Sequence, residues 1–581
     1  MFAILGAGLL FGACGTKTDN KAVGENPLLS KFETPFQVPP FDKIKAEHYM
    51  PAFKKAMEEH KNEIDAIINN QDVPNFENTI AALDKAGMTL RTVSSIFSNV
   101  RGTDTNDELQ KIAKEVSPLK SKHYDDISLN PELFKKVKAV YDKKDELNLN
   151  EEQLKLLTDT YKKFDRSGAN LPADKQARLR EINQKLSELS LKFDDNHLKE
   201  TNKFQMFIDN EDDLAGLPES VRAAAAIAAE NAGKKGQWLF TIQKPSLLPF
   251  LSFSEKRDLR EKMWTAYTTQ CNHDDELDNK EILKEMVKLR IEKGQLMGYD
   301  TYANFVLDDR MAKTPERVFE LLNKLMSEGN KVAKQERTEM QTMINEEGND
   351  FKLAPWDWWY YAEKLRVKKY NFNEEETRPY FKLENVRNGM FEVANKLWGL
   401  TFEEVKDIPK YNEANIVFEV KEANGDHLGL LYMDFHPRAS KGSGAWMTSF
   451  RKQYTENGKR VAPVISVVCN FTAPTKDKPS LLTFDEVSTL FHEFGHALHG
   501  LLSNTTYYTQ SGTSVPRDYV ELPSQIMENW ASQPEVIKMM GKHYETGETI
   551  PDEMIEKMKA AGLHNQGFTL TEFIAAGLLD M

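Results

Sequence analysis

Hydrophobic residues recur every three or four positions through most of the first half of the chain. This spacing places them on one face of a helix, with polar residues on the other face. It predicts an N-terminal helical region over residues 33–245. Two stripes carry the pattern most clearly: Phe53, Met57, His60, Ile64 and Ile67, and Leu179, Ile182, Leu186, Leu189 and Phe193. The second stripe alternates steps of three and four, which predicts a long helix in a coiled-coil-like pair.

The pattern changes to strict alternation near Asn415. Two alternating segments flank Asn424-Gly425, a pair that favours a tight turn between antiparallel strands. The segments "GAWMTSF" and "VAPVISVVCNF" have the composition of two further strands. We therefore expect a mainly α protein with one small antiparallel sheet, placed directly before the segment 483–500.

The segment "TFDEVSTLFHEFGHALHG", 483–500, is predicted to be a single helix. Thr483 is followed three residues later by Glu486, which is the spacing of a capping box at a helix start. Gly500 stands where a left-handed residue would end the helix. The sequence thus predicts a helix from about Phe484 to His499.

This helix carries a pattern of residues typical of metal sites. His492 and His496 are four residues apart, so both imidazoles face one side, at a separation that suits two nitrogens on one Zn²⁺. Glu493 can reach a metal-bound water without ligating the metal. This is the HExxH arrangement of zinc peptidases, and Glu493 is the candidate catalytic residue.

A catalytic zinc needs a third protein ligand from a second element. Glu521 lies 25 residues after His496, at the start of a helical stretch, and is the predicted third ligand. The alternative, that Glu521 is a first-turn carboxylate favoured by the helix dipole, stays open at this point. Glu528, two turns later, is a candidate to orient a ligating histidine. His499 is interpreted as a supporting or packing residue near the metal.

The motifs "FHEFGHALHG" and "SGTSVPRDYVELPSQIMENW" resemble those of the thimet oligopeptidase and peptidyl-dipeptidase family of zinc metallopeptidases. The segments "ASQPEV" and "DFHPRASKGSGAWM" are most similar to its bacterial peptidyl-dipeptidase branch. The resemblance implies one zinc per chain on His492, His496 and Glu521, with Glu493 as the general base. It also implies a substrate strand along the sheet edge near Gly444 and Ala445.

The resemblance further implies a two-lobed helical zincin with a deep channel that admits short unfolded peptides. The region 246–581 would be the catalytic part. Members of the family continue after "NQGFTLTEFIAAGLLDM" with a Gly- and Tyr-rich segment that contributes substrate-binding and oxyanion-stabilising side chains. We expect that segment to be missing here, because the final apolar helix has no C-cap and carries Asp580 in its last turn.

The N-terminus and the overall charge bear on location and partners. The apolar run "AILGAGLLFGA" ends in small residues before Cys14, as in a bacterial lipoprotein signal, although no basic segment precedes it. We expect a signal peptide over 1–13, a tether over 14–32, and a lipid-anchored protein of the cell envelope, facing the periplasm. Without that signal the protein would be cytoplasmic. The net charge of -14 argues against a nucleic-acid partner.

The function predicted from these features is zinc-dependent hydrolysis of oligopeptides by a monomer, with release of C-terminal dipeptides. Two alternatives stay open. An oligoendopeptidase of the same family would use the same metal motif. A non-catalytic, zinc-containing peptide-binding lipoprotein would keep the metal for structure alone.

Overall fold

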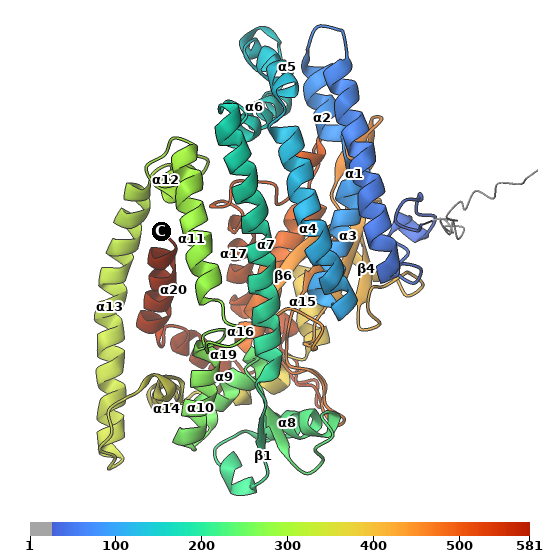
Figure 1. Ribbon diagram of the computed structural model, residues 1–581. Coiled ribbons are helices and arrows are strands. Elements are labelled where there is room, and N and C mark those ends of the chain that lie inside the picture. The colour runs from blue at the N-terminus through green and yellow to red at the C-terminus, as the bar shows by residue number, and fades with distance from the viewer. Residues whose placement is uncertain (1–25) are drawn as a thin grey trace, which may run out of the picture.

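The computed structural model describes residues 26–581, and their fold is mainly helical (Figure 1). The predicted signal segment 1–13 and Cys14 lie outside the described residues. The described end of the predicted tether packs on the helical body, because Leu28 is buried and Asn26 Nδ2 donates a hydrogen bond to the His48 carbonyl at 2.8 Å. Within 26–581, no helix has both the length and the apolar character that a bilayer crossing needs.

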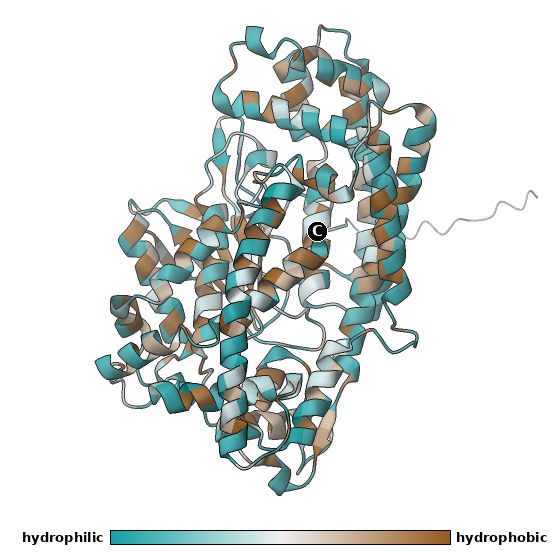
Figure 2. Ribbon diagram, turned by 90° about the vertical axis from the view of Figure 1, so that its left-hand side faces the viewer, coloured by the Kyte–Doolittle hydropathy of each residue, from teal (hydrophilic) through white to brown (hydrophobic). Residues whose placement is uncertain are grey.

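The N-terminal part is a succession of helices. They are α1 (Ala46–Asn69), α2 (Ala82–Lys85), α3 (Met88–Thr103), α4 (Asp107–Ser128), α5 (Pro131–Tyr141), α6 (Glu151–Arg166), α7 (Ala173–Lys203), α8 (Glu219–Asn231), α9 (Lys244–Phe253) and α10 (Arg257–Thr268). The predicted long helix is α7, with 31 residues. It packs beside α4, where the hydroxyls of Ser117 and Ser187 lie 2.6 Å apart. Hydrophobic and hydrophilic residues share the same helices, as amphipathic packing requires (Figure 2).

Helices also dominate the C-terminal part. They are α11 (Lys280–Leu296), α12 (Tyr302–Leu307), α13 (Pro315–Glu346), α14 (Trp358–Tyr370), α15 (Leu383–Trp398), α16 (Phe484–Leu501), α17 (Leu522–Ala531), α18 (Pro534–Met540), α19 (Asp552–Ala561) and α20 (Gln566–Asp580). Helix α20 docks on α13, where Gly567 N–H donates to Glu336 Oε1 at 3.0 Å. Helices α13 and α20 stand on the opposite side of the molecule from α1 and α3 (Figure 1).

A five-stranded sheet lies between these helices. Its order is β3 (Thr401–Glu404), β4 (Ile416–Lys421), β5 (His427–Asp434), β9 (Val464–Val468) and β6 (Trp446–Arg451). The predicted hairpin is β4–β5, and its turn contains Gly425 with φ +89°. The small sheet is present, but it is mixed rather than wholly antiparallel, because β5 and β9 pair in parallel. Two short hairpins accompany it: β1 (Met206–Ile208) with β2 (Trp238–Phe240), and β7 (Tyr454–Glu456) with β8 (Lys459–Val461).

Both faces of the central strands are buried, since successive side chains of a strand point to opposite faces. Leu431 and Ile465 belong to a core shared with α15, α16 and α18. Leu430 and Val464, their neighbours in sequence, belong to a core shared with α1, α3 and α4. The sheet therefore joins the N-terminal helices to the helix that carries both histidines of the motif. Strand β6 is an edge strand, and its first residues follow directly after Gly444 and Ala445.

Candidate metal centre

Helix α16 begins with the predicted capping box. Thr483 Oγ1 accepts a hydrogen bond from Glu486 N–H at 3.2 Å, and Glu486 Oε2 accepts one from Thr483 N–H at 2.9 Å. The prediction that Gly500 ends the helix in a left-handed cap is wrong, because α16 continues to Leu501 and Gly500 is helical. A Cβ on Gly500 would lie 2.8 Å from the side chains of Ile465 and Met447, so glycine there allows the helix to approach the sheet.

The structure brings His492, His496 and Glu521 together. Glu521 Oε2 lies 3.2 Å from His492 Nε2 and 3.0 Å from His496 Nε2. One nitrogen or oxygen from each side chain falls within 4.8 Å of the other two, which is close enough for a shared metal ion. Two imidazoles and one carboxylate form the ligand set of a catalytic His₂Glu zinc site. The donor atoms present therefore fit Zn²⁺.

Glu521 lies next to the histidines because α16 and α17 approach each other closely. Glu521 immediately precedes α17, and a Cβ on Gly495 of α16 would lie 2.6 Å from both Pro523 O and Ser524 Cα of that segment. Only a residue without a side chain fits this contact. Ser524 Oγ also donates a hydrogen bond to Glu521 Oε2 at 2.9 Å, which fixes the carboxylate. Gly495 is not marked by the metal motif; its signal in the sequence is a glycine inside a helix, where it costs about 1 kcal/mol relative to alanine.

Glu528 lies on the other side of the first histidine. Its Oε1 is 2.5 Å from His492 Nδ1. With Nδ1 engaged by a carboxylate, the lone pair of His492 Nε2 is directed towards Glu521 and the metal position. Glu528 thus contacts the His492 ring, and its role in orienting a metal ligand stays a prediction.

Glu493 projects from α16 beside the cluster and is 5% exposed. Burial raises the pKa of this carboxyl to about 7, although nearby His492 and a backbone hydrogen bond with Met447 oppose the shift. Its Oε2 has no hydrogen-bond partner among residues 26–581. A carboxyl with a pKa near neutrality and an unengaged oxygen is suited to accept and return a proton.

His499 points to a different environment. It lines a second cavity of about 530 Å³ together with Trp398, Tyr519 and Ile526. Its Nδ1 is buried without a hydrogen-bond partner in the described part of the chain. No hydrogen bond in 26–581 connects His499 to the three candidate ligands. Its predicted supporting role is therefore not based on a direct hydrogen bond to any of them.

Gly444 and Ala445 line a cavity of about 700 Å³. Thr489, three residues before His492 on α16, lines the same cavity, so the cavity extends alongside the helix that carries the two histidines. The N-terminal region contributes Arg101 and Asp195 to the wall, and α9 contributes Lys244. Both parts of the chain therefore enclose this space, and the predicted substrate-binding residues lie at its border.

A convergent His-His-Glu cluster with an adjacent buried carboxyl, on a helical scaffold, defines a metallopeptidase-type site. The model of peptidase family M3 matches residues 250–581. The dipeptidyl carboxypeptidase of Escherichia coli (strain K12) is 38% identical over 557 residues, which cover 96% of this chain and 82% of that relative. Oligopeptidase A of the same organism is 35% identical over 561 residues, with the same coverage of 96% and 82%. The chain belongs to peptidase family M3.

A solved structure of PZ peptidase A with inhibitor 2 also aligns with the chain. The TM-score is 0.46 at 17% sequence identity, over 91% of this chain and 74% of that one. The family assignment rests on the sequence relatives, and the peptidases of this family are zinc metallopeptidases. The His492–His496–Glu521 group is the place in 26–581 where the structure offers such a metal its ligands.

Proposed function

We propose that the protein is a zinc-dependent peptidyl-dipeptidase that binds one Zn²⁺ per chain through His492, His496 and Glu521. The observation that carries this proposal is the convergence of these three side chains within 4.8 Å beside the buried Glu493. A zinc ion in that position would lower the pKa of a coordinated water towards ~7 and polarise the scissile carbonyl.

Residues of this chain carry out proton transfer, orientation of the His492 ring and substrate binding. Glu493 accepts a proton from the attacking water and returns it to the leaving amine, for which its raised pKa is suited. Glu528 holds the His492 ring through Nδ1. Gly444 and Ala445 present main-chain groups to an extended peptide at the cavity border.

A change of Glu493 tests the catalytic proposal directly. Glu493→Gln should reduce the rate of peptide hydrolysis by at least ~10²–10⁴-fold, because a general base is lost, while zinc stays bound. The same variant separates this proposal from a non-catalytic peptide-binding protein, which has no use for an unengaged carboxylate beside the metal. Activity that survived the change would contradict the assignment of Glu493.

Release of dipeptides requires a group that binds the free C-terminal carboxylate. Lys244 lines the cavity at the start of α9, and no carboxylate in 26–581 lies within ion-pairing distance of it. By contrast, Arg366 and Arg378 of the same wall are already paired with glutamates. Asp485, in the first turn of α16, lines the same cavity as Lys244. Burial raises the pKa of its carboxyl, and the charge of Lys244 opposes this shift.

An oligoendopeptidase is the second candidate, favoured by the 35% identity with oligopeptidase A. Digestion of one oligopeptide with a free and with an amidated C-terminus distinguishes the two. Stepwise loss of dipeptides from the free form alone supports the dipeptidase. Internal cleavage of both forms at similar rates would establish the endopeptidase.

For location, we propose a lipid-anchored protein of the cell envelope. The support is the apolar run that precedes Cys14 in the sequence. Incorporation of labelled palmitate into the wild-type chain, and its loss in Cys14→Ser, would support the proposal. Recovery of the unlabelled wild-type protein in the cytoplasmic fraction would contradict it.

A further inference from the structure

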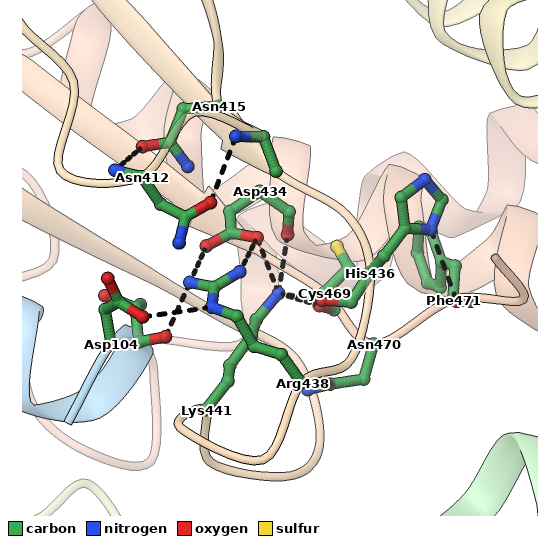
Figure 3. A network of polar contacts seen from close by, with 12 residues as sticks. Asp104, Asn412, Asn415, Asp434, His436, Arg438, Lys441, Cys469, Asn470 and Phe471 are labelled. Carbon is green, nitrogen blue, oxygen red and sulfur yellow. Dashed lines mark hydrogen bonds and ion pairs between the residues drawn. The ribbon is translucent and has the colours of Figure 1, made fainter. Parts of the chain in front are cut away.

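A buried group of charges lies beneath the loop that carries Gly444 and Ala445. Asp434, at the end of β5, is fully buried, and Arg438 binds its carboxylate through two nitrogens at 2.9 and 2.7 Å (Figure 3). Lys441 Nζ, also fully buried, lies 2.8 Å from Asp434 Oδ1. Although burial opposes its ionisation, the pKa of Asp434 is lowered, because both cations stabilise the carboxylate. We call these three residues the Asp434 hub.

The loop 435–445 folds around the ammonium group of Lys441. In addition to the Asp434 carboxylate, its Nζ donates hydrogen bonds to the carbonyls of His436 at 2.9 Å and Cys469 at 2.5 Å. These carbonyls belong to the loop itself and to the segment that follows β9. A buried ammonium with this many acceptors is held in one position, since each lost contact would leave a polar group unsatisfied. The hub therefore fixes the loop directly before Gly442.

The same loop is joined to the C-terminal end of α3. Gly442 N–H donates to the Gly102 carbonyl at 2.9 Å, and Arg438 Nη2 donates to the Thr103 carbonyl at 2.5 Å. The last carbonyls of a helix have no partners within it, so these two contacts supply what α3 lacks. Ser440 Oγ adds a hydrogen bond to Asp104 Oδ1 at 2.9 Å.

Beyond the hub, Asn470 holds the part of the loop that borders the cavity. Its Nδ2 donates to the carbonyls of Gly442 at 2.9 Å and Gly444 at 2.6 Å. The N–H of Gly444 has no acceptor in the described chain, and Gly444 has φ +85° with open space beside it. The loop thus presents a free main-chain donor at Gly444, while the carbonyls of Gly442 and Gly444 on either side of Ser443 are held by Asn470.

We propose that the Asp434 hub and Asp104 are positioning residues for substrate. They hold the Gly444–Ala445 main chain in place before a peptide arrives, and they make the end of α3 part of that support. A preformed loop binds a peptide with a smaller loss of conformational entropy than a loop that must become ordered. This inference rests on the proposed function, and it assigns to the N-terminal helical region a share in substrate affinity.

Ser440→Ala removes the hydrogen bond to Asp104 and changes no residue of the buried hub. Asp104→Asn weakens the same contact and also removes the charge that pairs with Arg438 Nε at 3.6 Å. Ser440→Ala and Asp104→Asn should each raise KM for an oligopeptide by about tenfold with kcat nearly unchanged, since uniform binding is lost. Ser440→Thr keeps the hydroxyl and should restore KM. Asp126→Asn is the matched control: it removes a carboxylate that pairs with Arg180 on the outer surface and should leave KM unchanged.

Hydrogen exchange provides a readout that does not depend on activity. In Ser440→Ala and Asp104→Asn, amides of 436–445 should exchange about tenfold faster than in wild type. The exchange rates of the α16 amides and the amount of bound zinc should stay unchanged. Unchanged exchange of the loop, or a KM equal to that of Asp126→Asn, would overturn the inference. An inactive wild-type protein would instead contradict the proposed function, and loop exchange would still decide whether the hub positions the loop.

Discussion

His492 Nδ1 and Glu528 Oε1 lie 2.5 Å apart, and this contact determines which nitrogen of His492 faces the metal position. The carboxylate accepts a hydrogen bond from Nδ1–H, so the proton of the neutral ring stays on Nδ1 and Nε2 keeps its lone pair for a cation. Glu528 is also 38% exposed at its side chain, so its replacement leaves no buried charge behind.

Glu528→Gln should therefore weaken zinc binding by about 10–100-fold without unfolding the protein. The measurement is a competition titration with a zinc chelator. Glu535→Gln, an exposed glutamate of the neighbouring helix α18, is the matched control and should bind zinc as wild type does. Equal zinc affinity of the two variants would show that Glu528 has no orienting role.

Gly495→Ala should separate α16 from α17, because the new Cβ would meet backbone atoms at 2.6 Å, where no flexible side chain can move away. We expect a loss of roughly 1–3 kcal/mol in the free energy of unfolding and a marked loss of zinc affinity, since Glu521 moves with α17. Gly577→Ala in α20 meets its nearest atom at an ordinary 3.5 Å and should be neutral or stabilising. Thermal unfolding and zinc titration of both variants check this expectation.

The buried imidazole of His60 makes the free energy of unfolding depend on pH. The imidazole is buried, its Nδ1 lies 3.0 Å from His123 Nε2, and burial lowers its pKa to about 4, with His123 and nearby cations adding to the shift. Between about pH 6.5 and 4 the unfolded chain binds a proton that the folded protein does not, so the free energy of unfolding falls as pH falls.

Between pH 7 and pH 4.5, the free energy of unfolding should fall by roughly 2–3 kcal/mol more in wild type than in His60→Asn. Asn keeps a polar atom for His123. Denaturant unfolding of wild type and variant at pH 7 and pH 4.5 measures the difference. Identical slopes against pH would show that His60 does not contribute.

Lys244→Met tests the proposed binding of the C-terminal carboxylate. Hydrolysis of a peptide with a free C-terminus should lose about tenfold in kcat/KM, whereas an amidated peptide should be unaffected. Lys262→Met, an exposed lysine of α10 that is not part of the cavity wall, is the control. An equal loss for both peptides would contradict a role in recognising the carboxylate.

Much of the site could be predicted because its determinants are local. The capping box at Thr483 and Glu486 and the four-residue spacing of His492 and His496 follow from helix geometry alone. The wrong helix end at Gly500 has a tertiary cause. A glycine can permit close packing as well as end a helix, and only the position of Ile465 shows which applies.

Features that depend on distant segments could not be read from the chain. The parallel pairing of β5 with β9 and the contact of Gly495 with Pro523 join segments whose sequences carry no mutual signal. The Asp434 hub is likewise invisible, because Arg438 and Lys441 have the composition of a solvated loop until β5 and β9 enclose them. These features support the site without forming part of its motif.

Everything proposed for the chemistry requires one zinc ion between the two imidazoles of α16 and the carboxylate before α17. Crystals of the purified protein, with data collected above and below the zinc absorption edge, test this most directly. One anomalous peak per chain about 2.0–2.2 Å from His492 Nε2, His496 Nε2 and a Glu521 oxygen is the predicted result. A zinc peak at other residues, or an active protein with no metal at these three, would contradict it.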